Sequence, residues 1–227
     1  MLPEWARSPQ ELLTRWQATC RKRDLRKQVA FFMSLGWGAR RCKLFAAACT
    51  RAAFSERLNR RSLALLDLVE CRADDRSAEE ELLTEINAIY KEIDDFETNG
   101  WPNRETHRCG GPVLRVAYDV ACQTPLFAAG SMAACWRHRE LFGRILTMMV
   151  GPGWKWKDEW RSDTVVALAG GIYGEQAWER MPILSDALVD AGCDEANLLG
   201  YCRGDGPFFR GCLVLDAILE NSDGEPA

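Results

Sequence analysis

The chain has 227 residues, of which 47% are hydrophobic and 27% are charged. This balance is typical of a globular protein and excludes a disordered chain, and the length suffices for one large domain or two small ones. Nowhere do about 18 apolar residues run together, which excludes a membrane-spanning helix and contact with a membrane by that route. Residues 1–17 include Glu4 and Glu11 and no apolar stretch of signal-peptide length, so we expect the protein to remain in the cytoplasm.

The net charge of -4 conceals an uneven distribution along the chain. Residues 1–61 hold 14 Lys or Arg against 4 Asp or Glu, whereas the remaining residues hold 15 against 29. Two interpretations remain open. Either a basic surface meets an acidic partner, or a basic face and an acidic face of the same molecule attract each other.

The amino-terminal third is predicted to form four helices. The tetrapeptide Ser-Pro-Gln-Glu at residues 8–11 combines an N-cap hydroxyl, a proline at the first helical position and a glutamate three residues after the cap. A helix should therefore begin there and run to about Cys20. Further helices are expected over residues 25–35, 39–54 and 56–72, the first of them ended by glycines.

The middle of the chain is predicted to contain one long helix, a loop and a helical pair. Residues 77–80 (Ser-Ala-Glu-Glu) form a capping box, and apolar positions between residues 82 and 93 recur at three- and four-residue spacings, with acidic residues on the other face. Residues 98–112 are rich in Gly, Pro and Asn and are predicted to form a loop. The helical pair is expected over residues 113–123 and 132–150.

The carboxy-terminal third is also predicted to be helical, over residues 163–169, 175–191, 194–202 and 208–220. Residues 170–174 (Gly-Gly-Ile-Tyr-Gly) lack the lysine of a phosphate-binding loop and follow no strand, so they are expected only to break a helix. No segment shows the two-residue alternation of apolar and polar side chains that is typical of a strand pair. The fold class is therefore predicted to be all-α, an irregular multi-helix bundle. We expect segments at 1–98, 99–150 and 151–227, or one domain formed by all three.

The carboxy-terminal third carries a long sequence pattern. Its parts are residues 164–169, 172–173, 180–184, 186–188, 190–193, 202–203, 206–207, 210–212 and 215–216. A second set comprises residues 43–46, 48–49, 61–62, 70 and 73–74. The two sets resemble a bacterial family that exists as many paralogues and to which no activity is assigned. The resemblance covers roughly half the chain and implies no catalytic or binding residues. The family often has His near the positions of Tyr201 and Phe208, where this chain has none, so no metal role of that loop is implied.

The ten cysteines are predicted to be mostly free thiols, because no export signal accompanies them. Cys42 and Cys49 lie seven residues apart in an apolar helical run, which indicates core packing. Cys193, Cys202 and Cys212 are too far apart in sequence for a redox motif. A nucleophilic role for one of them would need a neighbouring base, so burial in the core is the preferred interpretation.

One group of His and Cys residues has the chemistry of a zinc site, although its spacing is loose. Zinc needs four nitrogen or sulfur ligands, and Cys135 and His138 would lie one helical turn apart. The alternative is that these are isolated core thiols and surface histidines. The candidate ligands are His107, Cys109, Cys135 and His138, with Cys122 nearby.

A basic run near the amino terminus is the strongest functional signal in the sequence. If the helices align its charges on one side, these residues can contact nucleic-acid phosphates, although a solvated face is the simpler interpretation. The residues are Arg21, Lys22, Arg23, Arg26, Lys27, Arg40, Arg41 and Lys43. Trp154, Trp156 and Trp160 alternate with lysines and offer either an aromatic interaction surface or indoles docked onto neighbouring helices.

These observations favour a non-catalytic, cytoplasmic helical interaction or accessory protein that binds another protein and needs no cofactor. The sequence has only two His and no evident pairing of nucleophile and base. One alternative is an accessory protein that associates with nucleic acid through basic residues between 21 and 61. The other alternative is a zinc- or thiol-dependent enzyme.

Overall fold

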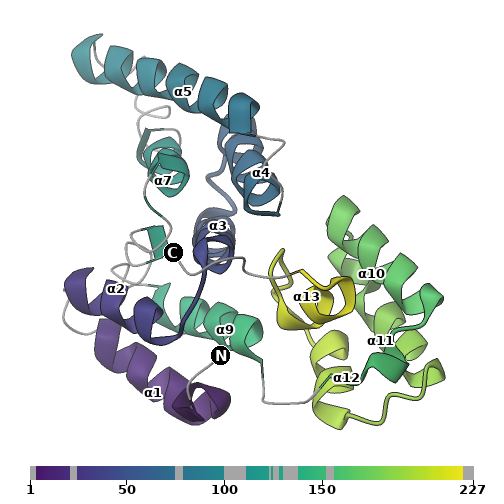
Figure 1. Ribbon diagram of the computed structural model, residues 1–227. Coiled ribbons are helices and arrows are strands. Elements are labelled where there is room, and N and C mark those ends of the chain that lie inside the picture. Colours follow the sequence, from purple (N-terminus) through teal and green to yellow (C-terminus); the bar gives the residue numbers. More distant parts are fainter. Residues whose placement is uncertain are drawn as a thin grey trace. The chain divides into compact units, whose positions relative to one another are not determined.

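The computed structural model describes residues 4–20, 25–74, 79–99, 111–122, 124, 128–129, 138–151 and 156–221. Over these ranges the chain forms helices and contains no strand, which confirms the predicted all-α, multi-helix architecture (Figure 1). Within the same ranges, no helix combines the length and the apolar composition needed to cross a membrane.

Eleven α-helices and three short 3-10 helices are present in the described residues. The α-helices are α1 (Pro9–Cys20), α2 (Leu25–Ser34), α3 (Ala39–Phe54), α4 (Arg60–Asp74), α5 (Glu79–Asn99), α7 (Gly111–Cys122), α9 (Arg139–Val150), α10 (Asp163–Glu175), α11 (Met181–Asp190), α12 (Ala196–Arg203) and α13 (Leu213–Leu219). The 3-10 helices are η1 (Glu4–Arg7), η4 (Asp158–Trp160) and η5 (Trp178–Arg180).

Local capping signals explain where several helices begin. The Ser8 hydroxyl accepts a hydrogen bond from the Glu11 amide at 3.5 Å, so α1 begins where the capping box predicted. The Asn59 side chain accepts a hydrogen bond from the Ser62 amide at 2.8 Å. For this reason α4 begins at Arg60, later than the predicted start at residue 56.

The prediction that Gly170 and Gly171 break a helix was wrong. α10 continues through both glycines to Glu175 and ends where Gln176 adopts a left-handed conformation. Each glycine costs a helix about 1 kcal/mol relative to alanine. The buried side chains of Ala169 and Ile172 keep this segment on the core, and that tertiary packing outweighs the weak local propensity.

The chain divides into two compact units. The α2–α7 unit comprises Gln17–Phe142, and the α10–α13 unit combines Met1–Trp16 with Gly143–Ser222. The predicted division between residues 98 and 99 separates α5 from α7, whereas these two helices pack against each other within one unit.

In the α2–α7 unit, α3 is the central helix. It packs against α4 and α7, and α5 packs against both of those helices. Phe32, Trp37 and Phe45 form an aromatic cluster with ring centroids 5.1–5.8 Å apart. Cys42 and Cys49 are fully buried, which confirms their predicted place in the core, and all eight cysteines in the described ranges are free thiols.

Arginines of α3 and α4 pair with carboxylates that follow them in the sequence. Arg40 Nε donates to Asp74 Oδ1 at 2.8 Å, and Arg61 binds Glu85 and Glu92 of α5. The basic and acidic parts of the chain therefore attract each other within this unit, which is the second of the two interpretations that the charge distribution left open.

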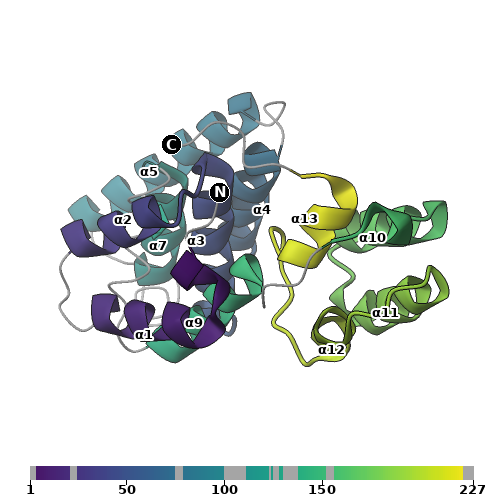
Figure 2. The same cartoon turned by 60° about the horizontal axis from the view of Figure 1, so that its bottom comes forward.

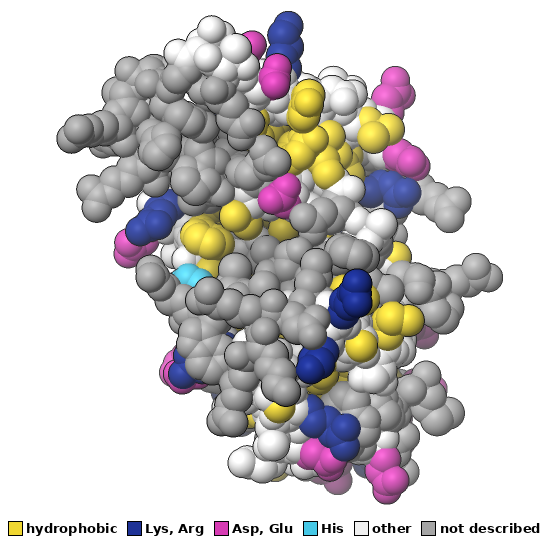
Figure 3. Space-filling model, turned by 90° about the vertical axis from the view of Figure 1, so that its left-hand side faces the viewer, with side chains coloured by type: hydrophobic (Ala, Val, Ile, Leu, Met, Phe, Trp, Pro, Cys, Tyr) yellow, Lys and Arg dark blue, Asp and Glu magenta, His cyan; other side chains and the backbone are white. Residues whose placement is uncertain are grey.

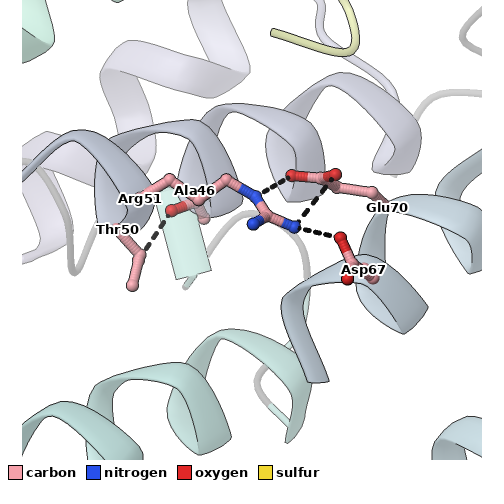
Figure 4. A network of polar contacts seen from close by, with 5 residues as sticks. All are labelled: Ala46, Thr50, Arg51, Asp67 and Glu70. Atoms are coloured by element: carbon pink, nitrogen blue, oxygen red, sulfur yellow. Dashed lines mark hydrogen bonds and ion pairs between the residues drawn. The ribbon is translucent and has the colours of Figure 1, made fainter. Parts of the chain in front are cut away.

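Another of these pairs involves Arg51 of α3, which points toward α4 (Figure 4). Its Nε donates to Glu70 Oε1 at 2.8 Å and its Nη2 donates to Asp67 Oδ1 at 2.6 Å. Burial lowers the pKa of Arg51, but the two carboxylates outweigh that effect and raise it overall. The Glu70 side chain is 4% exposed and Asp67 is 50% exposed, so this network links α3 to α4 with one carboxylate buried and the other at the surface.

In the α10–α13 unit, α10 packs against α11 and α13, and α12 packs against α11 (Figure 2). Ile172, Leu184, Leu198 and Leu215 are fully buried and form its core. A left-handed turn at Gly151, with φ of +79°, brings the chain against Leu213.

Candidate functional site

The structure places the predicted nucleic-acid-binding residues in several different environments. Arg26 and Lys27 are exposed on α2. Arg40 is buried and its guanidinium pairs with Asp74, so it cannot also face a nucleic acid. Arg41 is half-buried. Arg21, Lys22 and Arg23 lie outside the described residues.

Lys43, the last member of the basic set, also points inward. Its ammonium donates hydrogen bonds to the backbone oxygens of Val120 at 2.6 Å and Ala121 at 3.1 Å. These are carbonyls of the last turn of α7, which have no partner within their own helix and are favourably met by a cation. Lys43 therefore acts as a cap that joins α3 to α7.

The face shown in Figure 3 carries Lys and Arg side chains beside Asp, Glu and hydrophobic side chains. Both signs of charge and apolar surface are thus present on it. Of the predicted basic set, Arg40 and Lys43 have internal roles in the α2–α7 unit.

The described part of the chain contains a cavity of about 290 Å³ within the α2–α7 unit. Four helices build it, and its lining combines short apolar side chains with three cationic ones. The lining residues are Ala39, Arg40 and Lys43 of α3, Val69, Arg72 and Ala73 of α4, Leu82 of α5 and Ala121 of α7.

Burial changes the acidity of the lysine in this lining. Removal from water disfavours the charged ammonium and lowers the pKa of Lys43 from 10.5 to about 8, while the thiols of Cys122 and Cys42 oppose that change. A fraction of Lys43 is therefore neutral at slightly alkaline pH.

The exposed apolar side chains of α5 form a second candidate site. Leu83 is 53% exposed and Tyr90 is 57% exposed. Residues seven apart lie on the same side of a helix, and half-buried Ile86 falls on that side as well. We call Leu83, Ile86 and Tyr90 the α5 stripe. The ring of Tyr90 lies 6.1 Å from that of Tyr118 of α7, which continues the apolar surface beyond α5.

Other large apolar side chains are exposed singly in the described ranges. Met33 lies on α2 and Leu63 on α4. Ile183 and Val189 both lie on α11, but a separation of six residues places them on different sides of the helix. Single exposed apolar residues are ordinary on protein surfaces, so the α5 stripe differs from them in being contiguous.

The predicted zinc ligands cannot be compared as a group. His107, Cys109 and Cys135 lie outside the described residues. His138 is half-buried, and its ring lies 5.8 Å from that of Phe54 and 5.7 Å from that of Phe142. Within the described ranges, no three His, Cys, Asp or Glu side chains come together as a metal site.

The tryptophans show packing inside the α10–α13 unit. Trp160 is 1% exposed, so it belongs to the core and cannot supply the interaction surface that was one of its two predicted roles. Trp156 is half-buried with its ring 5.7 Å from that of Trp160, and the Lys157 ammonium lies 4.9 Å from the Trp160 ring centroid. Trp154 lies outside the described residues.

The thiols of the same unit are held in their protonated form. Burial raises the pKa of Cys202 and of Cys212 to about 12, and it also raises the pKa of Cys193. The thiolate is the nucleophilic form of cysteine. The surroundings of these three residues therefore favour the structural role over catalysis.

The chain matches no known family model, no curated protein and no solved structure. The resemblance to a multi-paralogue bacterial family stays a prediction. Its pattern residues have evident structural roles here. Leu184, Leu188 and Leu215 are fully buried, the Arg210 guanidinium lies 5.3 Å from the ring centroid of Tyr173, and Asp216 is buried at the start of α13.

Sequence reasoning missed the cavity. Its lining comes from helices that are separated by dozens of residues, so the pattern is visible only once α3, α4, α5 and α7 are packed. The α5 stripe was within reach, because the predicted amphipathic helix had more apolar residues than one buried face accommodates. Leu82, Ile89 and Ile93 are buried, whereas Leu83 and Tyr90 are left exposed.

Proposed function

We propose that this chain is a non-catalytic helical protein that binds another protein through the α5 stripe. The observation that carries the proposal is the exposure of Leu83 and Tyr90, more than half each, on one side of a helix that also bears Ile86. Large contiguous apolar surface costs free energy in water, and its burial is a main driving force for protein association.

The charge around the stripe indicates the kind of partner. α5 contains eight Asp or Glu and one Lys, and Glu80, Glu81, Asp94 and Asp95 are exposed. A complementary partner presents an apolar helix face bordered by Lys or Arg, because opposite charges at the rim speed association and select the partner.

The test is photo-crosslinking from the stripe. A benzophenone amino acid at position 90 is expected to capture one protein that the same group at position 33, on exposed Met33 of α2, does not capture. With that partner purified, the double variant L83K/Y90K should weaken binding by at least roughly tenfold, since two exposed apolar anchors become cations facing a basic rim. The control M33K should bind as the wild type does.

Two results would refute this function. One is a set of crosslinked proteins that is the same from positions 90 and 33. The other is a captured partner whose affinity is unchanged in L83K/Y90K while circular dichroism shows that the variant is folded. Both substitutions replace exposed side chains, and such changes usually alter the free energy of unfolding by less than about 0.5 kcal/mol.

Nucleic-acid association is tested separately by electrophoretic mobility shift at two salt concentrations. Contact with phosphates by several Lys and Arg predicts an affinity that falls steeply with salt. We expect no shift at either salt concentration. A salt-dependent shift that is lost when exposed Arg26 and Lys27 are replaced would favour the nucleic-acid alternative.

A further inference from the structure

The position of the α5 stripe around its helix follows from the contacts that α5 makes. Successive residues of an α-helix are about 100° apart around the axis. Glu85 and Glu92 bind Arg61 of α4, and they lie about 160–180° from Leu83 around α5. Helix α4 is therefore on the side of α5 opposite the α5 stripe.

Helix α7 is on the same side of α5 as the stripe. The ring of Tyr90 lies 6.1 Å from that of Tyr118 of α7, and Ile86, which lies on the same edge of α5, is half-buried. Helices α5 and α7 pack against each other, so the α5 stripe borders the line along which they meet. A pair of packed helices with apolar side chains along that line presents a surface on which a third helix can pack.

The surface drawn in Figure 3 agrees with this arrangement. In its upper part, at the height that α5 and α7 have in Figure 1, hydrophobic side chains lie together, with Asp and Glu side chains around them. An apolar surface with charged residues at its edge is the usual composition of a protein interface.

Exposed carboxylates lie beyond both ends of the α5 stripe and on its own side of the helix. Glu80 precedes Leu83 by one turn and Asp94 follows Tyr90 by one turn, and both fall within about 60° of Leu83 around the axis. Within the described ranges neither carboxylate forms an ion pair. A rise of 1.5 Å per residue places Glu80 and Asp94 about 21 Å apart along α5.

This charge pattern disfavours a second copy of the chain as the occupant of the stripe. Antiparallel pairing of two α5 helices would bring Glu80 of one copy to Asp94 of the other, and parallel pairing would bring like ends together. Like charges that face each other across an interface weaken association. A helix with cations at both ends meets a carboxylate at each end in either direction.

We propose that the α5 stripe binds a single amphipathic helix that carries Lys or Arg at both ends and lies along the line where α5 meets α7. This inference rests on the proposed function and specifies the partner. Apolar residues of the partner helix, at three- and four-residue spacings, cover Leu83, Ile86 and Tyr90. Its terminal cations, about 21 Å apart, meet Glu80 and Asp94.

The test is the fluorescence anisotropy of labelled helical peptides mixed with the full chain. The first peptide has about 18 residues, with leucines at helical spacing in its middle and a pair of lysines at each end. The second peptide has glutamates in place of the lysines, and the third keeps the lysines but has its leucines out of helical spacing. The first peptide is expected to bind at least roughly tenfold more tightly than either of the others, because it alone combines the apolar face with the matching charges.

The matched variants are E80K/D94K and E179K/D190K, which change the net charge equally. Glu179 and Asp190 are exposed in the α10–α13 unit, away from α5 in the sequence and in a different unit. E80K/D94K should weaken binding of the lysine-ended peptide by roughly tenfold and should make the glutamate-ended peptide the tighter ligand. E179K/D190K should keep the wild-type preference.

The reversed preference is a result that misfolding cannot produce, because an unfolded variant would lose affinity for both peptides. The helix itself is expected to tolerate the change. A lysine in place of Glu80 loses a favourable interaction with the amino-terminal end of the α5 dipole, whereas a lysine in place of Asp94 gains one at the carboxy-terminal end.

Photo-crosslinking locates the bound peptide. A benzophenone amino acid at position 90 should crosslink to the leucine-containing middle of the lysine-ended peptide, and the same group at position 33 should not. Sedimentation velocity of the full chain alone is expected to show a monomer, since the carboxylates oppose pairing of two α5 helices.

Three results would overturn this inference: equal affinity for the lysine-ended and glutamate-ended peptides, an unchanged preference in E80K/D94K, or a dimer that L83K/Y90K dissociates. A protein captured at position 90 through a segment that is not a basic-ended helix would also overturn it, while leaving the proposed function intact. The proposed function fails on a different result, which is capture of the same proteins from positions 90 and 33.

Discussion

Replacement of Lys43 by methionine is expected to change how the free energy of unfolding depends on pH. The unfolded chain holds the Lys43 proton up to its ordinary pKa of 10.5, whereas the folded protein releases it at about 8. Between these two values the unfolded state binds more protons than the folded state, so the Lys43 contribution to stability rises with pH in this window. Below pH 8 both states are protonated and the contribution is constant.

The size of the effect follows from the two pKa values. Each pH unit inside the window adds about 1.4 kcal/mol to the free energy of unfolding. Between pH 7 and pH 10 the free energy of unfolding of the wild type should therefore rise by about 2.5 kcal/mol relative to that of Lys43→Met. Methionine keeps the apolar stem and removes the titrating group, and the hydrogen bonds to Val120 and Ala121 are lost at every pH.

The measurement is urea denaturation of both proteins at pH 7, 8, 9 and 10. The difference between the two curves is needed because other groups titrate as well. Cys20, Cys202 and Cys212 have a folded pKa of about 12 against an ordinary 9, so they remove stability as the pH rises above 9. This loss is common to wild type and variant and cancels in the difference.

A difference that stays constant from pH 7 to pH 10 would refute the reasoning, since it would mean that Lys43 keeps its proton in the folded state. The control is Met33→Leu, which replaces one exposed, non-titrating side chain of α2 by another and should give a difference that does not vary with pH.

Three further substitutions test the packing by urea denaturation at pH 7. Gln28→Met should stabilise the protein by about 1 kcal/mol, because both amide atoms of this fully buried side chain lack a hydrogen-bond partner among the residues that the structure describes; a loss of stability would contradict this. Glu70→Gln should cost about 2 kcal/mol, less than for a fully enclosed pair because Arg51 is partly exposed and keeps Asp67; an unchanged midpoint would show that the pair contributes nothing. Gly151→Ala should cost about 1–2 kcal/mol, because φ is +79° and the added Cβ would lie 2.2 Å from a Leu213 methyl; a neutral result would show that the turn adapts.

Most helices could be predicted from local signals. α1 and α3 were predicted with their observed ends, since a capping box begins the first and glycines precede the second. α10 was predicted too short because glycine propensity is a local quantity, whereas the burial of Ala169 and Ile172 is tertiary. Prediction from local sequence signals does not include the stabilisation that a helix gains when its side chains pack in the core.

The candidate sites depend even more on tertiary contacts. Arg40 and Lys43 look like surface cations in the sequence, but packing of α3 turns them toward Asp74 and the end of α7. The uneven charge distribution indicated that basic and acidic parts of the chain could attract each other, but it did not identify which residues form the ion pairs. Exposure of Tyr90 is likewise settled only when the buried face of α5 is known.

In the ion pairs of the α2–α7 unit, the arginine comes before its carboxylate partner in the sequence. Arg40, Arg51 and Arg61 precede the carboxylates described as their partners, which lie between Asp67 and Glu92. Translation runs from the amino terminus, so residues 1–61, which hold 14 Lys or Arg against 4 Asp or Glu, are made before these carboxylates. Most of the positive charge of this segment is therefore offset only once α4 and α5 are folded, and its neutralisation accompanies completion of the unit.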